Sequence, residues 1–403
     1  MDLHIGEWIS YLTRWTHLIA GISWIGSSFY FMWLDSSLEE PDDAARARNP
    51  DLEGSLWMTH SGGFYEVQRK RIGPGRMPKV LHWFKYEALF TWISGVFLLS
   101  IAYHVNAAGF MVDPSVSSVT PGQAVPLSVA LIIASWFLYD SIWQFLGGRR
   151  PGIATAFSVF LAGGIAVAFC HLLAGRAAFI HFGALLGTWM VANVWVRILP
   201  AQQKMIDATA EGRAPDLALS AQAKRRSVHN TYMTFPVLFM MISNHYPHVT
   251  SGSLNWINLL LLTVLGASIR HVMVAKEGEG AWAAAPALGS LLALGLVSSG
   301  LGRVPLDGVT SAADAAPVHF KTAHSIITSR CVACHAEKPA IATYGPSPGG
   351  VRFDSPERIK SYAERIKFRA VLTRTMPLAN QTGITDEERR TLGAWVDQGA
   401  KLE

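Results

Sequence analysis

The sequence has few charges and few cysteines. Charged residues make up only 16% of its 403 positions, while 50% are apolar. This balance excludes an ordinary soluble globular protein. Three cysteines are too few for a disulfide-built scaffold. From residue 319 onward there are about 13 Lys/Arg against 9 Asp/Glu, while the preceding part is almost neutral and its cations are confined to particular loops. This distribution suits a membrane protein with a basic appended domain and argues against a nucleic-acid partner.

Other common signatures are also missing from the sequence. No convincing G-x-G-x-x-G follows a strand and opens a helix, which excludes a conventional flavin or nicotinamide fingerprint. No internal repeat is evident. No cleavable signal peptide is expected, because Met1–Glu7 is not basic and the apolar stretch after it is long enough to remain as a membrane span.

Long apolar segments dominate the first three quarters of the chain. A helix needs about 20 mainly apolar residues to cross the hydrocarbon core of a bilayer. Eight segments approach this length, of which the sixth is short and interrupted by Pro236. They are residues 9–34, 84–105, 126–146, 153–173, 176–199, 231–246, 254–274 and 282–301. The sequence therefore predicts an all-α polytopic membrane helix bundle of about eight spans in a lipid bilayer.

The loops between these segments alternate in charge. Lys and Arg follow the first, third, fifth and seventh segments, whereas loops 106–125 and 247–253 contain neither. Cytoplasmic loops carry the Lys/Arg excess in membrane proteins. The N-terminus and everything after the eighth segment are therefore expected on the non-cytoplasmic side.

Composition divides the chain into three parts. Residues 1–302 form the predicted multi-span membrane domain. Residues 303–318 contain few large apolar side chains and are predicted to be a linker. Residues 319–403 have an ordinary globular composition and are predicted to form a small, mainly helical domain.

Two of the three cysteines belong to the run Cys331-Val332-Ala333-Cys334-His335, which is C-x-x-C-H. This pattern is typical of c-type haem attachment. Two thiols reach the two vinyl groups of one porphyrin, and the adjoining histidine lies beneath the iron as its proximal ligand. A four-ligand zinc site would want more cysteines or spaced histidines, and a redox dithiol would not need His335. The predicted location also fits, since bacteria attach c-type haem outside the cytoplasm.

The second axial ligand is predicted to be Met376, the only methionine after Met273. A thioether opposite histidine raises the haem potential, as suits an electron carrier. The Met376-Pro377 pair resembles that of class I cytochromes c. A methionine that only fills the core, or ligation by His319 or His324, are the alternatives.

Local patterns in the C-terminal part agree with a small cytochrome. Residues 317–330 are expected to form a helix that leads into the C-x-x-C-H motif. Thr385 and Glu388 have the spacing of a capping box. The helix that they open places Leu392, Trp395 and Val396 on one face, suited to cross the first helix near Phe320.

Histidines inside apolar spans are costly and indicate function. The candidates for a catalytic or haem-b role are His17, His104, His171 and His181, which the topology places toward the side of the expected c haem. Paired intramembrane histidines would be able to ligate a second, b-type haem. Asp140 also lies within an apolar segment, where a charge is harder to explain, while Arg14 and Arg197 can snorkel to an interface.

Segments 17–30, 62–65 and 82–87 (HLIAGISWIGSSFY, GGFY and HWFKYE) together resemble the bacterial membrane-bound urate hydroxylases (PuuD type). Those proteins combine an N-terminal multi-span domain with a C-terminal cytochrome c, and the resemblance covers essentially the full chain. It implies an inner-membrane protein with a periplasmic cytochrome domain that acts in purine catabolism.

The implied reaction oxidises urate with water to 5-hydroxyisourate. Its electrons would pass through the c haem to a downstream cytochrome c or terminal oxidase. Only the haem residues carry over from the resemblance: Cys331, Cys334, His335 and Met376. For the urate site, chemistry predicts Arg or backbone N–H donors for the anion and a histidine as general base.

Two other functions remain open from the sequence. One is a non-enzymatic, membrane-anchored electron-transfer cytochrome, although a single span would suffice as its anchor. The other is a transporter or a redox sensor. A transporter should show broken spans with convergent polar groups, for which Pro236 and Pro286 are the only hints.

Overall fold

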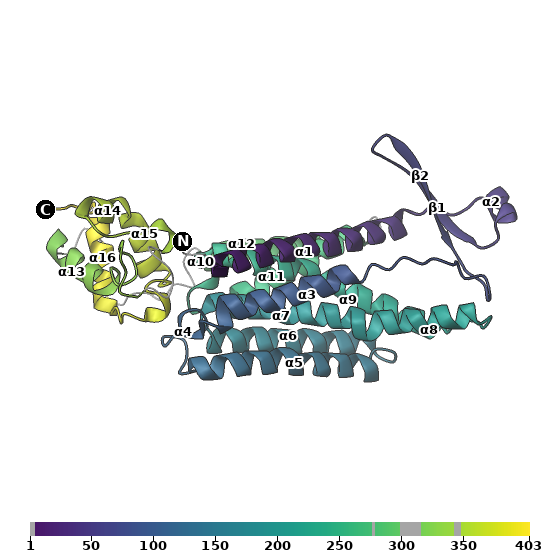
Figure 1. Cartoon of the computed structure of the whole chain (residues 1–403), viewed down its shortest axis with the longest axis horizontal. Coiled ribbons are helices and arrows are strands. Elements are labelled where there is room, and N and C mark those ends of the chain that lie inside the picture. The colour runs from purple at the N-terminus through teal and green to yellow at the C-terminus, as the bar shows by residue number, and fades with distance from the viewer. Residues whose placement is uncertain (1–4, 276–278, 299–315, 342–347) are drawn as a thin grey trace.

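A computed structural model describes residues 5–275, 279–298, 316–341 and 348–403 of the chain. The molecule is mostly helical and elongated (Figure 1). A bundle of long helices forms its middle, a small C-terminal domain lies at one end, and a β-hairpin projects at the other. The predicted linker lies outside the described residues, except for its last three positions.

The bundle consists of long helices that each overlap one of the eight predicted segments. They are α1 (Ile5–Ser37), α3 (Tyr86–Leu99) with η1 (Ser100–His104), α5 (Pro121–Phe145), α6 (Pro151–Leu172), α7 (Gly175–Ala192) with η2 (Asn193–Ile198) and α8 (Leu199–Ala210), α9 (Leu217–Ile242), α11 (Asn255–Val274), and α12 (Ala284–Leu296) after η4 (Ala281–Ala283). Within the described residues, five helical stretches are long and apolar enough to cross a membrane: Tyr86–His104, Pro121–Phe145, Pro151–Leu172, Gly175–Ala210 and Asn255–Val274. The count of eight spans stays a prediction.

Helix α7 is the centre of the bundle. It packs against α3, α5, α6 and α9, and its side chains Phe179, Phe182 and Leu185 are fully buried. Outward-facing side chains of the surrounding helices are also apolar; Phe137 and Phe160, for example, are 63% and 77% exposed. A continuous apolar exterior of this kind is suited to a lipid environment.

The expectation of an all-α chain needs one correction. Strands β1 (Leu52–His60) and β2 (Gly63–Lys70) form an antiparallel hairpin beside the short helix α2 (Asp43–Arg48). Ser61 and Gly62 form its two-residue turn with φ of 51° and 79°, as the right-handed twist of a hairpin requires. The aromatic and β-branched residues of these strands favour β-structure. They lie among basic residues, and that composition is typical of a loop, so the hairpin was not predicted.

Short elements close the end of the bundle that faces the C-terminal domain. They are α4 (Ala107–Phe110), η3 (Ser243–His245) and α10 (Pro247–Thr250). Figure 1 shows α4, α10 and the start of α1 at this end, whereas α8 and the hairpin lie at the opposite end. The loops rich in Lys and Arg after the first and fifth segments are therefore remote from residues 319–403.

The C-terminal domain is built from short helices around one apolar core. They are α13 (Phe320–Arg330), η7 (Pro348–Gly350), α14 (Pro356–Ser361), α15 (Ala363–Ile366), η8 (Lys367–Leu372), η9 (Leu378–Asn380) and α16 (Asp386–Asp397). Helix α16 crosses α13, and the Phe320 and Trp395 rings lie 5.9 Å apart. The predicted capping box is confirmed by reciprocal hydrogen bonds between Thr385 and Glu388 of 2.8 and 3.1 Å.

Candidate functional site

A single cavity of about 1580 Å³ spans the junction between the bundle and the C-terminal domain. Its lining joins residues that are far apart in the sequence. The C-terminal domain contributes Cys331, Cys334, His335 and Met376, and the bundle contributes Arg14, His17, Tyr103, His104, Arg176, Asn244 and His245. Ligand pockets commonly have volumes of about 300–1,000 Å³, so this cavity has room for more than one small molecule.

The two domains touch directly at this junction. Helix α4 of the bundle contacts η9 of the C-terminal domain, and the Gln381 side-chain amide donates a hydrogen bond of 3.5 Å to the Ala108 carbonyl. Arg369 lies close enough to Arg176 for their charges to interact. Both parts of the chain therefore line the cavity.

His335 has a fixed orientation within the C-terminal part of the cavity. Because a carbonyl only accepts, Nδ1–H of His335 donates the 3.1 Å hydrogen bond to Val351 O. In the neutral imidazole this leaves the lone pair on Nε2, the atom that would ligate a metal. The Phe353 ring packs 5.4 Å from the imidazole, and the Phe353 N–H donates to the His335 carbonyl at 2.9 Å.

The protonation states of the C-x-x-C-H side chains follow from their burial. Burial raises the pKa of the Cys331 thiol to about 12 and also raises the pKa of Cys334. Burial lowers the pKa of His335. The imidazole is thus neutral near pH 7, which is the form that binds iron. All three cysteines of the chain are free.

The methionine expected opposite His335 lines the same cavity. Its backbone N–H donates to Arg369 O at 3.0 Å, and its carbonyl accepts from Arg389 Nη1 at 2.9 Å. Arg389 is buried, and burial lowers its pKa to about 10. His319 and His324 are not among the described lining residues. The arrangement around Met376 therefore fits a His/Met-ligated c-type haem.

A zinc site fits this part of the chain less well. Tetrahedral zinc needs four ligands, usually Cys or His. Within residues 5–275, 279–298, 316–341 and 348–403, no group of three or more His, Cys, Asp or Glu is arranged to hold a metal ion. A haem iron takes four of its ligands from the porphyrin, so it needs fewer ligands from the protein than a bare metal ion does. The residues around the motif therefore fit a haem better than a bare ion.

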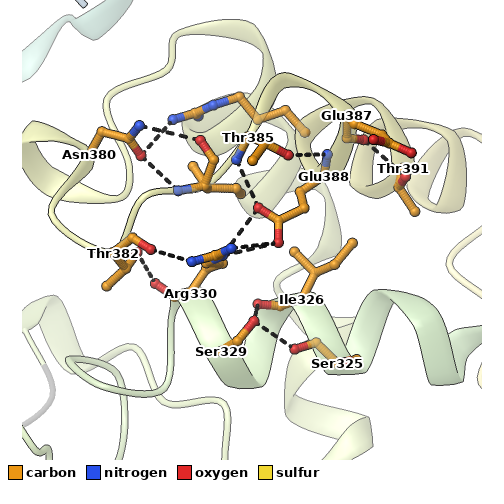
Figure 2. A network of polar contacts seen from close by, with 12 residues as sticks. Ser325, Ile326, Ser329, Arg330, Asn380, Thr382, Thr385, Glu387, Glu388 and Thr391 are labelled. Atoms are coloured by element: carbon orange, nitrogen blue, oxygen red, sulfur yellow. Dashed lines mark hydrogen bonds and ion pairs between the residues drawn. The ribbon is translucent and has the colours of Figure 1, made fainter. Parts of the chain in front are cut away.

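A polar network fixes the residue that precedes the motif (Figure 2). The Arg330 guanidinium binds the Glu388 carboxylate at 3.0 Å and donates to Thr382 O at 2.6 Å. The Thr382 hydroxyl returns a hydrogen bond of 2.7 Å to Arg330 O. The same Glu388 caps α16, so the network ties the end of α13 and the start of α16 to one position beside Cys331.

At the bundle end of the cavity, His17 is held by helix α3. Its Nδ1 lies 2.9 Å from Thr91 O and 3.1 Å from Ser94 Oγ. A proton on Nδ1 satisfies the Thr91 carbonyl and leaves Nε2 as an acceptor. The ring packs against Gly95, where a Cβ would lie only 3.0 Å from His17 Cε1. Glycine at this position makes room for the imidazole.

His104 and His181 form a pair across η1 and α7. Their Nε2 atoms are 3.2 Å apart, and His181 is fully buried. Two imidazoles on opposite faces of one iron would need about 4 Å between these nitrogens, since a metal–imidazole bond is about 2 Å. This pair therefore does not fit a bis-histidine b haem. A second haem elsewhere stays a prediction.

Two polar atoms on this part of the cavity lack partners. Arg176 Nε and Asn244 Oδ1 are buried and have no hydrogen-bond partner among the described residues. The Asn244 amide group donates to Tyr103 Oη at 2.6 Å, which fixes its orientation. Buried polar atoms are normally paired, so a polar ligand in the cavity would satisfy them. The sequence reading missed both residues; the available signal was that Arg176 is the only Lys or Arg at the junction of the fourth and fifth apolar segments.

The charged residues of the cavity lining are mostly basic. Arg14, Arg176, Arg330, Arg365 and Arg369 line it, and Glu7 supplies the carboxylate among the described lining residues. Burial lowers the pKa of Arg369, with additional contributions from the neighbouring Arg365 and Arg176 charges. Arginine nevertheless keeps its charge in proteins. A cavity with this balance favours anionic ligands.

One predicted candidate, His171, and two further histidines of the bundle lie outside the cavity. His171 is exposed on α6 and is not among the described lining residues. His229 and His271 instead form hydrogen bonds of 2.6 and 2.7 Å with the hydroxyls of Tyr139 and Tyr232. The histidines of the bundle thus differ in setting: some line the cavity, His229 and His271 pair with tyrosine hydroxyls, and His171 is exposed.

Asp140 belongs to such an internal network. Its carboxylate binds Arg197 and, at 2.6 Å, Arg226, which is only 3% exposed. Arg226 also donates to Asn193 Oδ1 at 3.2 Å. Arg197 therefore does not merely snorkel to an interface. These partners explain how charges are accommodated inside the bundle without a ligand.

Comparison with known proteins gives one finding. A family model described as urate oxidase N-terminal matches residues 3–299, which is most of the chain. No curated protein and no solved structure shows significant similarity to this chain.

Proposed function

Because the chain belongs to the urate oxidase N-terminal family, we propose that it is a membrane-bound urate hydroxylase. Family membership indicates a urate-related oxidoreductase. The finer proposal is that water and urate react to give 5-hydroxyisourate while the electrons leave through the C-terminal domain. The observation that carries it is the single cavity lined both by the C-x-x-C-H motif with Met376 and by the basic and histidine residues of the bundle.

The bundle end of the cavity suits urate. Urate is a planar anion at neutral pH, and its edge presents carbonyl and N–H groups in alternation. Arg176 offers positive charge and an unpaired donor, while Asn244 offers an unpaired acceptor. An anion that reaches both would satisfy buried atoms that otherwise remain unpaired. Arg14 adds further positive charge.

The C-terminal end of the cavity suits a covalent c haem. Cys331 and Cys334 would form the thioether links, with His335 and Met376 as axial ligands. When bound, this group accepts electrons one at a time at a raised potential. Arg365 and Arg369 line the cavity beside these residues and are suited to the propionate groups.

The membrane setting supports the same function. Five helices in the part of the chain that the structure describes are long and apolar enough to cross a membrane, and the loops rich in Lys and Arg predict the cytoplasmic side. The C-terminal domain would then lie in the periplasm of a bacterial inner membrane. From there a second cytochrome c or a terminal oxidase would take up the electrons.

Anaerobic addition of urate to the purified, fully oxidised protein in detergent tests the proposal. We expect haem reduction with two haems reduced for each urate lost, and 5-hydroxyisourate as the product. Oxygen-18 from labelled water should appear in that product. A protein that carries c haem, is fully reduced by dithionite and stays oxidised with urate would refute the proposal.

A further inference from the structure

The His104–His181 pair has a single consistent arrangement of protons. Nδ1 of His181 lies 2.8 Å from Ala177 O, which only accepts, so this nitrogen carries a proton. Neutral His181 then has a bare Nε2, which can accept the hydrogen bond from His104 Nε2–H at 3.2 Å. Neutral His104 is left with its lone pair on Nδ1.

The surroundings keep His181 fixed in this role. The side chain is fully buried on α7, and the rings of Tyr103 and Phe169 lie 5.8 and 6.0 Å from it. No polar partner besides Ala177 O and His104 contacts the imidazole among the described residues. His104 is partly exposed and lines the cavity, whereas His181 is not a described lining residue.

We infer that His104 is the general base that takes a proton from water in the urate site, and that His181 is the positioning residue that fixes the His104 tautomer. This inference rests on the proposed function. Arg176 and Asn244 line the same cavity as His104, and Asn244 donates a hydrogen bond to Tyr103, the residue that precedes His104 in the chain. A urate bound to them would therefore lie in the part of the cavity that His104 lines.

The chemistry balances with one base. A water O–H bond breaks, a bond forms between that oxygen and C5 of urate, and the released proton moves to His104 Nδ1. Two electrons leave urate for a one-electron acceptor, which is the c haem used twice or ferricyanide. Starting from the urate monoanion and ending at neutral 5-hydroxyisourate, this releases one proton overall.

Charged groups around the cavity will shape the pH dependence of this step. Those lining it at the bundle end are Glu7, Arg14, His17, Tyr103, Arg176 and His245, and His181 lies behind His104. The positive charges of the arginines disfavour a further positive charge on His104. Protonated His104 must also lose its proton before it can act as a base in the next turnover. We expect the rate to fall as the pH is lowered and His104 becomes protonated in the resting enzyme.

The decisive variant is His104→Gln. A glutamine amide can still donate to His181 Nε2, which keeps that buried atom paired, but it has no basic nitrogen. We expect urate-driven haem reduction to slow by about 10²- to 10⁴-fold, the usual contribution of general-base catalysis. Binding of radiolabelled urate to the dithionite-reduced protein should stay within threefold of wild type. The fall in rate at low pH, which we attribute to protonation of His104, should also be absent in this variant.

Variants at position 181 separate positioning from simple packing. His181→Gln can still present an acceptor to His104, whereas His181→Leu cannot. We expect the Gln variant to retain at least tenfold more activity than the Leu variant at equal haem content and thermal stability. His60→Ala, on the remote hairpin, is the matched control and should behave as wild type.

The outcomes are distinguishable. If urate fails to reduce the wild-type haem, the proposed function fails. If wild type is active and His104→Gln keeps its rate within threefold, or loses urate binding in proportion to its rate, the assignment of His104 as base is overturned while the proposed function stands. Equal activity of His181→Gln and His181→Leu overturns the positioning role.

Discussion

Replacement of Arg176 by glutamine should weaken urate binding. This arginine lies in the first turn of α7, lines the cavity, and has a buried Nε without a partner among the described residues. A hydrogen bond to a charged group contributes about 1.5–3 kcal/mol. Since each 1.4 kcal/mol corresponds to a factor of ten, the dissociation constant for urate should rise roughly 10- to 150-fold.

Lysine at the same position should give an intermediate effect. Arg176→Lys keeps the positive charge but lacks the planar fork and the Nε donor. About half of the lost binding free energy should therefore return. Arg213→Gln is the matched control, because Arg213 is exposed, pairs only with the nearby and equally exposed Glu211 among its described contacts, and does not line the cavity.

Equilibrium binding should be measured on dithionite-reduced protein under anaerobic conditions, so that no turnover consumes the ligand. Radiolabelled urate and equilibrium dialysis in detergent give the constant directly. The reasoning is refuted if Arg176→Gln binds urate within threefold of wild type while its thermal stability and haem content are unchanged.

Three further predictions concern stability, each measured as thermal unfolding in detergent. Gly183→Ala should cost about 1–3 kcal/mol through overpacking, since the new Cβ would lie 2.8 Å from Met240 Cβ, while Gly187→Ala on the same helix has free space and should be neutral. Equal effects of the two changes would contradict this. Thr385→Ala removes the capping hydrogen bond and should destabilise the C-terminal domain by about 1 kcal/mol. Asp140→Asn leaves two guanidinium groups without their carboxylate and should cost about 3–5 kcal/mol; a change below 1 kcal/mol would show that water already screens this network.

Features that depend only on residues close together in the sequence could be predicted from it. Segment length and apolar content located helices that overlap all eight predicted spans, and the Thr385–Glu388 spacing located a helix start. The C-x-x-C-H spacing requires only five consecutive positions. Each of these follows from geometry within a few turns of chain, so no knowledge of the fold was needed. The hairpin was missed because its short strands lie in a basic loop without a long hydrophobic period.

The tertiary structure decided which of the polar residues act together. His104 and His181 are 77 positions apart, and helix packing alone brings their Nε2 atoms to 3.2 Å. The same packing places Arg176 and Asn244 on one cavity with Cys331, while it leaves His171 exposed outside it. The sequence shows how far along a helix a residue lies. The neighbour that its side chain faces depends on how the helix is rotated about its own axis in the packed bundle.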